Sequence, residues 1–328
     1  MTIEGADLLE QLQTPALLVT RGQVAFANSA AKALLGAHIV GQDVRIAIRD
    51  PKAVAAILGE GGGTAQVSGL STGGSVWAID CRVIGPAYRL VSLYDLSERV
   101  SVAKSHADFV ANASHELRTP LANVLGYVET LLNPKAGGDE AVRTRFLETI
   151  RHEAQRMQAL ISDLMSLSRI EAVKHEVPSD RVDLVALGHE VAGEFRSSAN
   201  VSVRANCADA VIAGDRGQLA QVLRNLIDNA LKYGNPGGPV EVGVEAASTG
   251  WVLVTVRDEG EGIPPEHLPR VTERFYRADT SRSRAAGGTG LGLSIVKHVV
   301  ERHRGRFDID SRPGQGTTAS LMLPLKCD

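Results

Sequence analysis

A histidine, a carboxylate and a hydroxyl group lie close together in the segment Ser114-His115-Glu116-Leu117-Arg118-Thr119-Pro120. His115 is flanked by apolar residues two positions away on either side, so at about 100° per residue its imidazole points away from the apolar side of a helix. Thr119, four residues on, shares the face of the histidine. A neutral imidazole is a nucleophile, and Glu116 can take a proton from one ring nitrogen while the other attacks. The segment therefore predicts nucleophilic chemistry at His115.

The residues around this segment have the periodicity of a long helix that can bend. Pro120 has no backbone N–H, so the carbonyl of Glu116 loses its helical partner. Two consecutive steps of four in the apolar pattern fall at the same place, which locally unwinds a coiled coil. We expect a bend just beyond His115, although a surface histidine on a kinked helix is the alternative interpretation. The apolar positions recur at steps of three or four; they are Val110, Ala113, Leu117, Leu121, Val124, Val128 and Leu131.

A second set of polar residues forms a stripe on a helix expected near residues 217–233. Asparagine is a mediocre helix former, yet Asn225 and Asn229 lie four residues apart beside a broad apolar arc. A solvated helix face more often carries Glu and Lys. Amide oxygens with Lys232 suit an oxygen-coordinated magnesium ion and the phosphates that it binds. The stripe consists of Gln218, Gln221, Asn225, Asn229 and Lys232.

Two glycine clusters follow, the first at Asp258-Glu259-Gly260-Glu261-Gly262 and the second at Gly287-Gly288-Thr289-Gly290-Leu291-Gly292-Leu293. Glycines let the backbone approach phosphate oxygens, and the start of a helix after the second cluster offers unpaired N–H groups. Either cluster alone is a weak signal. A Walker P-loop is excluded because Gly-Lys-Ser/Thr is missing, and the second cluster does not match a dinucleotide fingerprint.

The segment between the clusters, residues 263–286, contains five arginines against three acidic residues. A basic, Ser- and Ala-rich segment in this place predicts a mobile lid over phosphates. A solvated loop is the alternative, and Phe275 is as compatible with anchoring the segment by packing as with chemistry. The arginines are Arg270, Arg274, Arg277, Arg282 and Arg284.

Length and composition limit the class of protein. At 328 residues the chain is expected to form two or three domains. A formal charge of −3 offers no general attraction to nucleic acid or anionic lipid, so no nucleic-acid partner is expected. No apolar run approaches the roughly 18 residues needed to cross a bilayer, and the first residues lack a signal-peptide pattern. We expect a cytoplasmic protein, or the cytoplasmic part of a longer one. The 3 cysteines suggest neither a disulfide framework nor a zinc site.

The middle of the chain predicts two long helices. The first runs from Ser97 to Leu132, residues 133–138 form a helix-ending turn, and the second spans about residues 139–172. Two helices joined by a short turn form an antiparallel hairpin, which alone leaves much of each apolar stripe in water. Pairing two copies into a four-helix bundle buries both stripes, so we predict a homodimer. The seam of the second helix is Leu147, Ile150, Ala154, Met157, Ile161 and Leu164.

The first part of the chain predicts a small mixed α/β domain over residues 7–96. Two strands, a helical middle and a hairpin over residues 76–84 and 88–94 follow one another. This order resembles a PAS sensor domain, as do the segments Val24–Ala31 and Asp95–Arg99. No flavin-attaching cysteine motif is present and His38 is expected at the surface, so the PAS ligand is unknown. A domain that only dimerises is the alternative.

The last part, residues 178–328, predicts an α/β domain with a largely antiparallel sheet and helices on one face, in contrast to a Rossmann order. We expect helices near residues 184–196, 217–233 and 290–304, and strands near 201–205, 240–244, 251–258, 307–311 and 317–323. The whole chain is thus expected to be a multidomain α+β protein.

The motifs together resemble those of the sensor histidine kinases, and of their PhoR-like group. The segment around His115 is similar to the phosphoacceptor box of that family, which implies a dimerisation and phosphotransfer domain over residues 97–177. The ordered set of the asparagine stripe, the first glycine cluster, Glu273–Arg277 and the second glycine cluster resembles the ATP-binding Bergerat, or GHKL, domain. The resemblance implies the cofactors ATP and Mg²⁺.

The resemblance also implies roles for single residues. Asn229 holds the metal and Asn225 supports it, while Lys232 and Tyr233 contact the phosphates and the nucleotide. Asp258 accepts a hydrogen bond from the adenine amino group. The pocket is completed by Gly260, Gly262, Gly288, Thr289, Gly290, Leu291, Gly292, Leu293 and Thr317; Ala319 stands where the family has an aromatic residue.

The predicted function is an ATP-dependent protein-histidine kinase that autophosphorylates His115 and passes the phosphoryl group to an aspartate of a response regulator. The resemblance also implies a second, phosphatase activity towards that regulator, in which Thr119 on the histidine's face positions a water molecule. One rival is an ATPase that drives conformational work, but such proteins place a glutamate where Asn225 stands, and an asparagine cannot take a proton from water. A second rival is an inactive signalling scaffold, which intact motifs disfavour.

Overall fold

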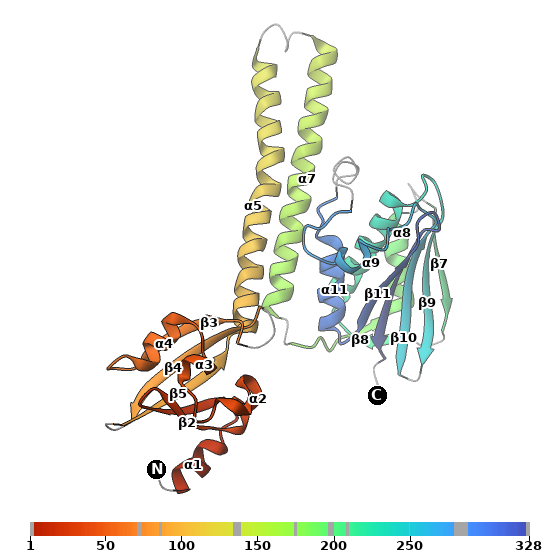
Figure 1. Ribbon diagram of the computed structural model, residues 1–328. Helices are drawn as coiled ribbons and strands as arrows, with labels where there is room; N and C mark the ends of the chain where they lie inside the picture. Colours follow the sequence, from red (N-terminus) through yellow and green to blue (C-terminus); the bar gives the residue numbers. More distant parts are fainter. Residues whose placement is uncertain are drawn as a thin grey trace. The chain divides into compact units, whose positions relative to one another are not determined.

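The computed structural model describes residues 3–70, 74–84, 87–133, 139–173, 176–195, 200–207, 210–248, 250–278 and 288–325. The chain divides into two compact units, Met1–Val110 and Ala111–Asp328. Helix α5 begins in the first unit and continues into the second (Figure 1). No helix among the described residues is both long enough and apolar enough to span a bilayer.

The first unit is built on a five-stranded antiparallel sheet with the strand order β2-β1-β5-β4-β3. The order of two strands, helices and a hairpin agrees with the sequence analysis, but β3 was not predicted. Its sequence, Gly-Thr-Ala-Gln-Val-Ser, lacks the alternation of large apolar residues that signals a strand. The strands are β1 Ala16–Thr20, β2 Gln23–Ala27, β3 Gly63–Ser68, β4 Val76–Ile84 and β5 Tyr88–Asp95. The helices are α1 Ile3–Glu10, α2 Ser29–Leu35, α3 Val44–Ala47 and α4 Pro51–Leu58, with a short 3₁₀ helix at Ala37–Ile39.

A buried asparagine joins the start of this unit to its first strands. The Asn28 side chain is fully buried and its Oδ1 accepts hydrogen bonds from the backbone N–H groups of Ala16, at 3.0 Å, and Ala31, at 2.9 Å. The second bond caps α2. Its Nδ2 donates to the carbonyl of Thr14 at 2.9 Å. The side chain therefore holds β1, α2 and the segment before β1 together, while His38 lies exposed as expected.

The helical hairpin consists of α5, Ser97–Leu132, and α7, Glu140–Ala172. These bounds agree closely with the periodicity of the sequence. Asp139 begins α7 by accepting hydrogen bonds from the N–H groups of Ala141 and Val142. Pro120 lies buried inside α5, which continues through it. The predicted turn lies outside the described residues at 134–138.

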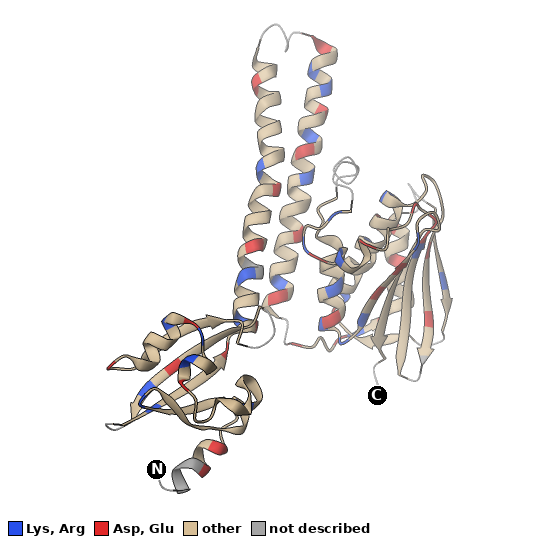
Figure 2. Cartoon of the chain, in the orientation of Figure 1, with Lys and Arg blue, Asp and Glu red and all other residues tan. Residues whose placement is uncertain are grey.

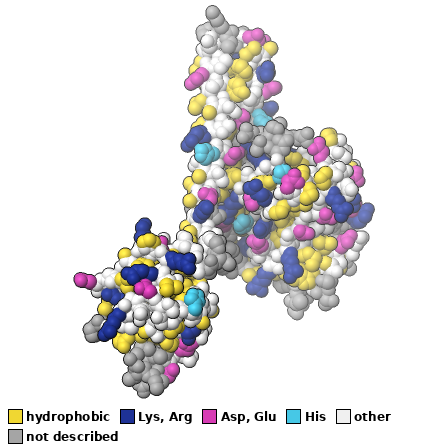
Figure 3. Space-filling view, in the orientation of Figure 1, with side chains coloured by type: hydrophobic (Ala, Val, Ile, Leu, Met, Phe, Trp, Pro, Cys, Tyr) yellow, Lys and Arg dark blue, Asp and Glu magenta, His cyan; other side chains and the backbone are white. Residues whose placement is uncertain are grey.

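Apolar side chains of the hairpin stay exposed within a single chain. On α5, Leu121, Leu125, Val128 and Leu132 follow one another at helical spacing, and α7 exposes Leu147, Ile161 and Met165. Hydrophobic patches accordingly lie along the surface of the hairpin (Figure 3). Several members of the predicted seams are thus solvent-exposed in the monomer, because one hairpin has too few partners to bury both stripes.

The rest of the second unit is an α/β sandwich around a sheet with the strand order β11-β12-β10-β9-β7. All neighbouring strands are antiparallel except β7 and β9, which are parallel. The strands are β7 Val201–Asn206, β9 Val240–Ser248, β10 Trp251–Asp258, β11 Arg306–Ser311 and β12 Thr317–Pro324. A small second sheet pairs β6, Arg181–Asp183, with β8, Val211–Ala213, and neither short strand was predicted.

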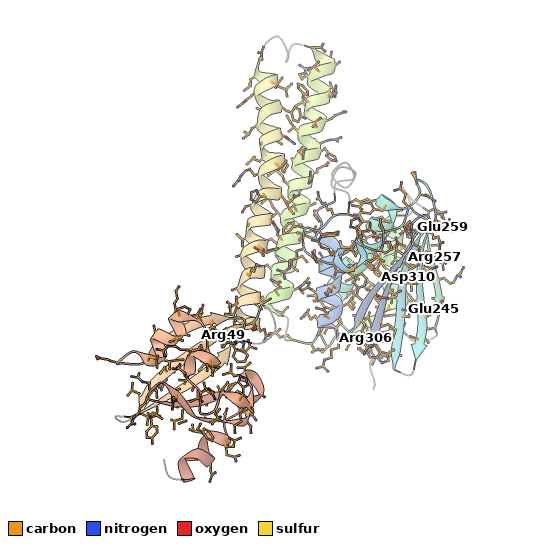
Figure 4. All side chains as sticks on the ribbon, viewed as in Figure 1. Arg49, Glu245, Arg257, Glu259, Arg306 and Asp310 are labelled. Atoms are coloured by element: carbon orange, nitrogen blue, oxygen red, sulfur yellow. The ribbon has the colours of Figure 1, made fainter. Side chains whose placement is uncertain are left out.

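Three helices cover one face of this sheet, as the sequence predicts: α8 Leu184–Phe195, α9 Arg216–Tyr233 and α11 Gly292–Arg302 (Figure 1). Alternate residues of β10 are buried on the helix side, whereas Arg257 is exposed. Figure 4 shows Glu245, Arg257 and Asp310 on the strands, on the side of the sheet away from α9 and α11. The sheet therefore has an apolar inner face and a charged outer face.

Candidate functional site

His115 lies on the exposed surface of α5, as its spacing predicts. Thr119 is also exposed, one turn further along the helix, and its hydroxyl donates to the carbonyl of His115 at 3.4 Å. A threonine in a helix commonly forms this bond to its own backbone. The imidazole is therefore accessible to a partner that approaches from outside the hairpin.

The carboxylate next to the histidine is held by two arginines. Arg156 Nη2 of α7 lies 3.4 Å from Glu116 Oε2, and Arg277 Nη2 lies 3.7 Å from the same oxygen. Arg277 comes from the segment between the glycine clusters, and its side chain is 8% exposed. Sequence reasoning did not identify this pairing. It holds the negative charge of Glu116 against the hairpin and the arginine-rich segment.

That segment contacts the hairpin at one further point and the nucleotide-binding part at two. Arg274 forms an ion pair with Glu171 of α7 and lies 3.4 Å from Nε2 of His298 on α11. Arg277 also donates to the carbonyl of Gly288 in the second glycine cluster. An ion pair therefore joins α7 to the arginine-rich segment. Charged residues are also spread along both helices of the hairpin (Figure 2). The predicted lid residues Arg282 and Arg284 lie outside the described residues.

Asp258 ends β10 and is 8% exposed. Burial raises the pKa of its carboxyl group, although hydrogen bonds from the backbone of Gly260 and Thr317 act in the opposite direction. The N–H of Gly260 donates to Asp258 Oδ1 at 2.8 Å. Ser311 Oγ lies 2.8 Å from Thr317 Oγ1, so Thr317 is fixed near the carboxylate. A buried anionic acceptor of this kind suits a ligand that donates a hydrogen bond.

Glycines make room for a recess at Asp258. A Cβ atom on Gly260 would lie 2.3 Å from the carbonyl oxygen of Tyr233, and one on Gly316 would lie 2.1 Å from that of Asp258. A cavity of about 190 Å³ extends from Asp258 beneath the turn that follows α9. Its lining is Asn200, Ala230, Leu231, Gly234, Asn235, Gly237, Gly238, Pro239, Val240 and Asp258. The recess and cavity are mixed polar and apolar, as the base of a nucleotide requires.

The asparagine stripe of α9 faces the second glycine cluster. Asn225 is half-buried and its Nδ2 donates to the carbonyl of Gly292 at 3.3 Å. Asn229 is half-buried one turn further along. Lys232 forms an ion pair with Asp228 at 2.6 Å, and Tyr233 is 42% exposed at the end of the helix. Asn225 therefore joins α9 directly to the second glycine cluster.

The second glycine cluster leads directly into α11, which begins at Gly292. Gly290 has φ +73°, and its carbonyl accepts a hydrogen bond from the N–H of Phe275 at 2.8 Å. Phe275 itself has φ +63°, a conformation that bulky residues rarely adopt. Thr289 Oγ1 donates to Asp163 Oδ2 of α7 at 2.7 Å and lies 3.3 Å from the N–H of Leu291. The start of α11 thus has a polar environment that suits an anion.

These residues fit a magnesium–nucleotide complex. Among the described residues, no group of three or more His, Cys, Asp or Glu side chains is arranged to hold a metal ion by itself. Mg²⁺ usually takes only one or two protein oxygens and fills its octahedron with phosphates and water. The side-chain amide oxygens of Asn225 and Asn229 on α9 can supply these one or two protein ligands. They lie on the helix that contacts the start of α11, where the N–H groups of the first helical turn suit a phosphate. The buried Asp258 and the glycine-lined recess meet the requirement of a base.

Sequence comparisons agree with this geometry. The family described as His Kinase A (phospho-acceptor) domain matches residues 105–173, and the family described as Histidine kinase-, DNA gyrase B-, and HSP90-like ATPase matches residues 214–326. Together the two matches cover more than half of the chain. The chain belongs to the sensor histidine kinases.

Individual sensor kinases are similar over the same region. The phosphate regulon sensor protein PhoR of Pseudomonas aeruginosa is 39% identical over 241 residues, which is 71% of this chain and 53% of PhoR. The sensor histidine kinase WalK of Bacillus subtilis is 36% identical over 239 residues, 71% of this chain and 39% of WalK. The chain therefore spans about half or less of the length of these curated relatives.

A solved structure shares the fold over almost the whole chain. The histidine kinase ThkA, in its complex with the response regulator protein TrrA, aligns with a TM-score of 0.51 at 17% identity and covers 98% of both chains. In this chain, the phospho-acceptor family match contains His115, Glu116 and Thr119. The ATPase family match contains the asparagine stripe, both glycine clusters and Thr317. The family thus supports ATP as the nucleotide.

Proposed function

We propose that the chain autophosphorylates His115 with MgATP and transfers the phosphoryl group to an aspartate of a response regulator. One observation carries the proposal. Arg277 donates to Gly288 of the nucleotide cluster and lies 3.7 Å from Glu116, the neighbour of His115. The arginine-rich segment therefore contacts both the second glycine cluster and the residue next to His115, and it can bring a nucleotide bound at that cluster close to the histidine.

The nucleotide is bound by residues at both ends of the recess. Asp258 accepts the hydrogen bond of the adenine amino group, and Thr317 completes this base site. Lys232, Tyr233 and the cluster Gly288–Leu293 contact the ribose and phosphates. Asn229, supported by Asn225, holds Mg²⁺. When bound, the metal neutralises negative charge on the transferring phosphoryl group.

The chain's own residues supply the proton transfer. One ring nitrogen of neutral His115 attacks the γ-phosphorus of ATP, the bond from that phosphorus to the bridging oxygen of the β-phosphate breaks so that ADP leaves, and Glu116 accepts the proton from the other ring nitrogen. Arg156 and Arg277 both contact Oε2 of Glu116 in this structure, so the proton acceptor is the other carboxylate oxygen, Oε1. The two arginines hold the carboxylate beside His115.

The partner proposals follow from the hairpin. The exposed apolar stripes of α5 and α7 support a homodimer joined through a four-helix bundle. The exposed face with His115 and Thr119 supports docking of a response regulator, and ThkA has been solved with such a partner. Thr119 orients a water molecule for dephosphorylation of the regulator, which gives the chain a phosphatase activity as well.

The remaining proposals concern the organisation of the chain. The sheet order and the role of Asn28 in the first unit support a PAS-like sensor domain over residues 7–96. We assign residues 97–177 to dimerisation and phosphotransfer and residues 178–328 to nucleotide binding. We place the activity in the cytoplasm, where ATP and response regulators are available.

Labelling with γ-phosphate-labelled ATP tests the assignment of His115. The wild-type chain should acquire an acid-labile label, which is typical of phosphohistidine, and His115→Ala should acquire none. His152→Ala is the matched control, because His152 is an exposed histidine on the other helix of the hairpin. A label that persists in His115→Ala, or disappears in His152→Ala, would contradict the proposal. The rival ATPase function predicts steady phosphate release that is unaffected by His115→Ala.

A further inference from the structure

Helix α7 packs against the nucleotide-binding part of the second unit through one continuous face. Leu160, Leu167 and Ile170 of this face are buried, and α7 contacts α11. Between them, Ser166 Oγ donates to Gln221 Oε1 of α9 at 2.7 Å. The hairpin and the nucleotide site therefore share a formed interface in this structure.

Asp163 is the charged residue in the middle of this face. Its carboxylate accepts the hydrogen bond of Thr289 at 2.7 Å, at the start of α11. Burial raises the pKa of Asp163, the Lys232 ammonium group lowers it, and Asp228 raises it. These effects show that Asp163 lies within electrostatic reach of both charged residues at the end of α9. A carboxylate from the hairpin thus enters the polar environment of the nucleotide site.

The same groups are those that the proposed function assigns to phosphate binding. The Thr289 hydroxyl has one proton and can donate it to only one acceptor at a time. Lys232 and the start of α11 attract negative charge, but a phosphate placed there would meet the negative charge of Asp163 in a partly buried site. The carboxylate and a phosphate group therefore compete for the same environment.

We propose that Asp163 occupies the anion position that a nucleotide phosphate takes, so that docking of α7 on this face and binding of the triphosphate exclude one another. The inference rests on the proposed nucleotide site and concerns its regulation. Release of the Asp163–Thr289 contact opens the phosphate position, and any signal that shifts α7 relative to α11 changes the affinity for ATP.

The nucleotide-binding part stays attached to the hairpin when this contact opens. Arg302 of α11 donates through Nε to the carbonyls of Val173, at 3.2 Å, and Glu176, at 3.1 Å, at the end of α7. Its Nη1 donates to Gln218 Oε1 of α9 at 2.8 Å. These bonds are made by the residues that follow α7, and none of them involves Thr289. They can therefore keep α11 attached to the end of α7 while the phosphate position at Thr289 becomes free.

Calorimetric titration of the full chain tests the competition. The two ligands are the non-hydrolysable β,γ-imido analogue of ATP with Mg²⁺, and adenosine, which has no phosphate. Asp163→Asn keeps the shape and an acceptor for Thr289 but removes the charge. It should bind the analogue about three- to tenfold more tightly than wild type, because the fraction of binding-competent molecules rises. Its affinity for adenosine should equal that of wild type.

Two further variants sharpen the result. Asp163→Ala removes the acceptor as well and should bind the analogue at least as tightly as Asp163→Asn. Glu148→Gln removes an exposed acidic residue of the same helix and should leave both affinities unchanged. Equal affinity of wild type and Asp163→Asn for the analogue, or an equal gain for adenosine, would overturn the inference. Failure of the His115 assignment appears only in the labelling experiment, so the two failures are distinguishable.

Discussion

Arg277 Nη2 lies 3.7 Å from Glu116 Oε2, which joins the arginine-rich segment to the residue beside His115. Arg156 contacts the same carboxylate oxygen at 3.4 Å from the opposite helix of the hairpin. Neither ion pair involves Glu116 Oε1, and the two arginines hold the carboxylate in place beside His115.

Replacing Glu116 tests its role as the proton acceptor. Glu116→Gln should lower the initial rate of His115 labelling by about 10²-fold or more, the usual contribution of a general base. The dissociation constant for the ATP analogue should stay unchanged, since Glu116 contacts no part of the proposed nucleotide site except through Arg277. Quench-flow labelling and calorimetry provide the two measurements. Glu129→Gln, an exposed carboxylate on the same helix, is the control, and an unchanged rate in Glu116→Gln would exclude the role.

The long periodic elements could be predicted from the sequence, but the contacts between them could not. The bounds of α5 and β10 agree with the expected residues 97–132 and 251–258 because their apolar patterns extend over many residues. β6 and β8 have three residues each, too few to show an alternation. The glycine clusters were found because glycine is required where Cβ atoms would collide with backbone atoms.

Tertiary pairs left weaker signals in the sequence. Asp163 and Thr289 are separated by 126 residues, and neither position follows a periodic rule that connects it to the other. One signal was available: Asp163 interrupts the apolar face formed by Leu160 and Leu167, and a charged residue within such a face needs a polar partner. The pairing of Glu116 with two arginines had no comparable signal, because Glu116 lies at the edge of the apolar stripe.

Removal of the Asn229 amide tests the metal site. Asn229→Ala should abolish labelling of His115 and remove the increase in affinity for the ATP analogue that Mg²⁺ gives to wild type. In the presence of EDTA, the variant and wild type should bind the analogue equally, because the base and the glycine clusters are unchanged. Asn206→Ala serves as the control, since Asn206 is an exposed asparagine on β7 of the same domain. A variant that keeps full dependence on Mg²⁺ would refute the assignment.

Two neighbouring glycines with similar backbone conformations separate steric exclusion from backbone strain. Gly314 has φ +76° and open space around it, whereas Gly316 has φ +82° and its Cβ would lie 2.1 Å from the carbonyl oxygen of Asp258. Gly314→Ala should cost about 1–2 kcal/mol of unfolding free energy, the penalty of the left-handed conformation alone. Gly316→Ala should cost more than that and also weaken nucleotide binding. Urea unfolding and calorimetry measure both effects, and equal costs for the two variants would exclude a packing requirement at Gly316.

The buried charge of Asp258 should lower the free energy of unfolding of the protein, although the same charge is needed to bind the nucleotide. Burial raises its pKa in the folded state above the value in the unfolded chain. Between these two pKa values the folded state binds more protons than the unfolded state, so stability falls as the pH rises through this window, and the loss is complete above the pKa of the folded state. Asp258→Asn has no charge to bury. At pH 7 and without nucleotide, its free energy of unfolding should therefore be higher than that of wild type. This difference in stability should shrink as the pH falls towards the pKa of a carboxyl group in an unfolded chain, about 4.

The same variant should lose nucleotide affinity, because a hydrogen bond to a charged acceptor contributes about 1.5–3 kcal/mol, which corresponds to roughly 10- to 100-fold in the dissociation constant. Urea unfolding at several pH values and titration with the ATP analogue measure the two effects on the same protein. Asp308→Asn is the control, since Asp308 is exposed on β11, and it should show neither a pH-dependent gain in stability nor a loss of affinity. A stability advantage of Asp258→Asn that stays constant from pH 7 to pH 4 would mean that the buried charge is not its cause. Affinity equal to wild type would remove Asp258 from the base site.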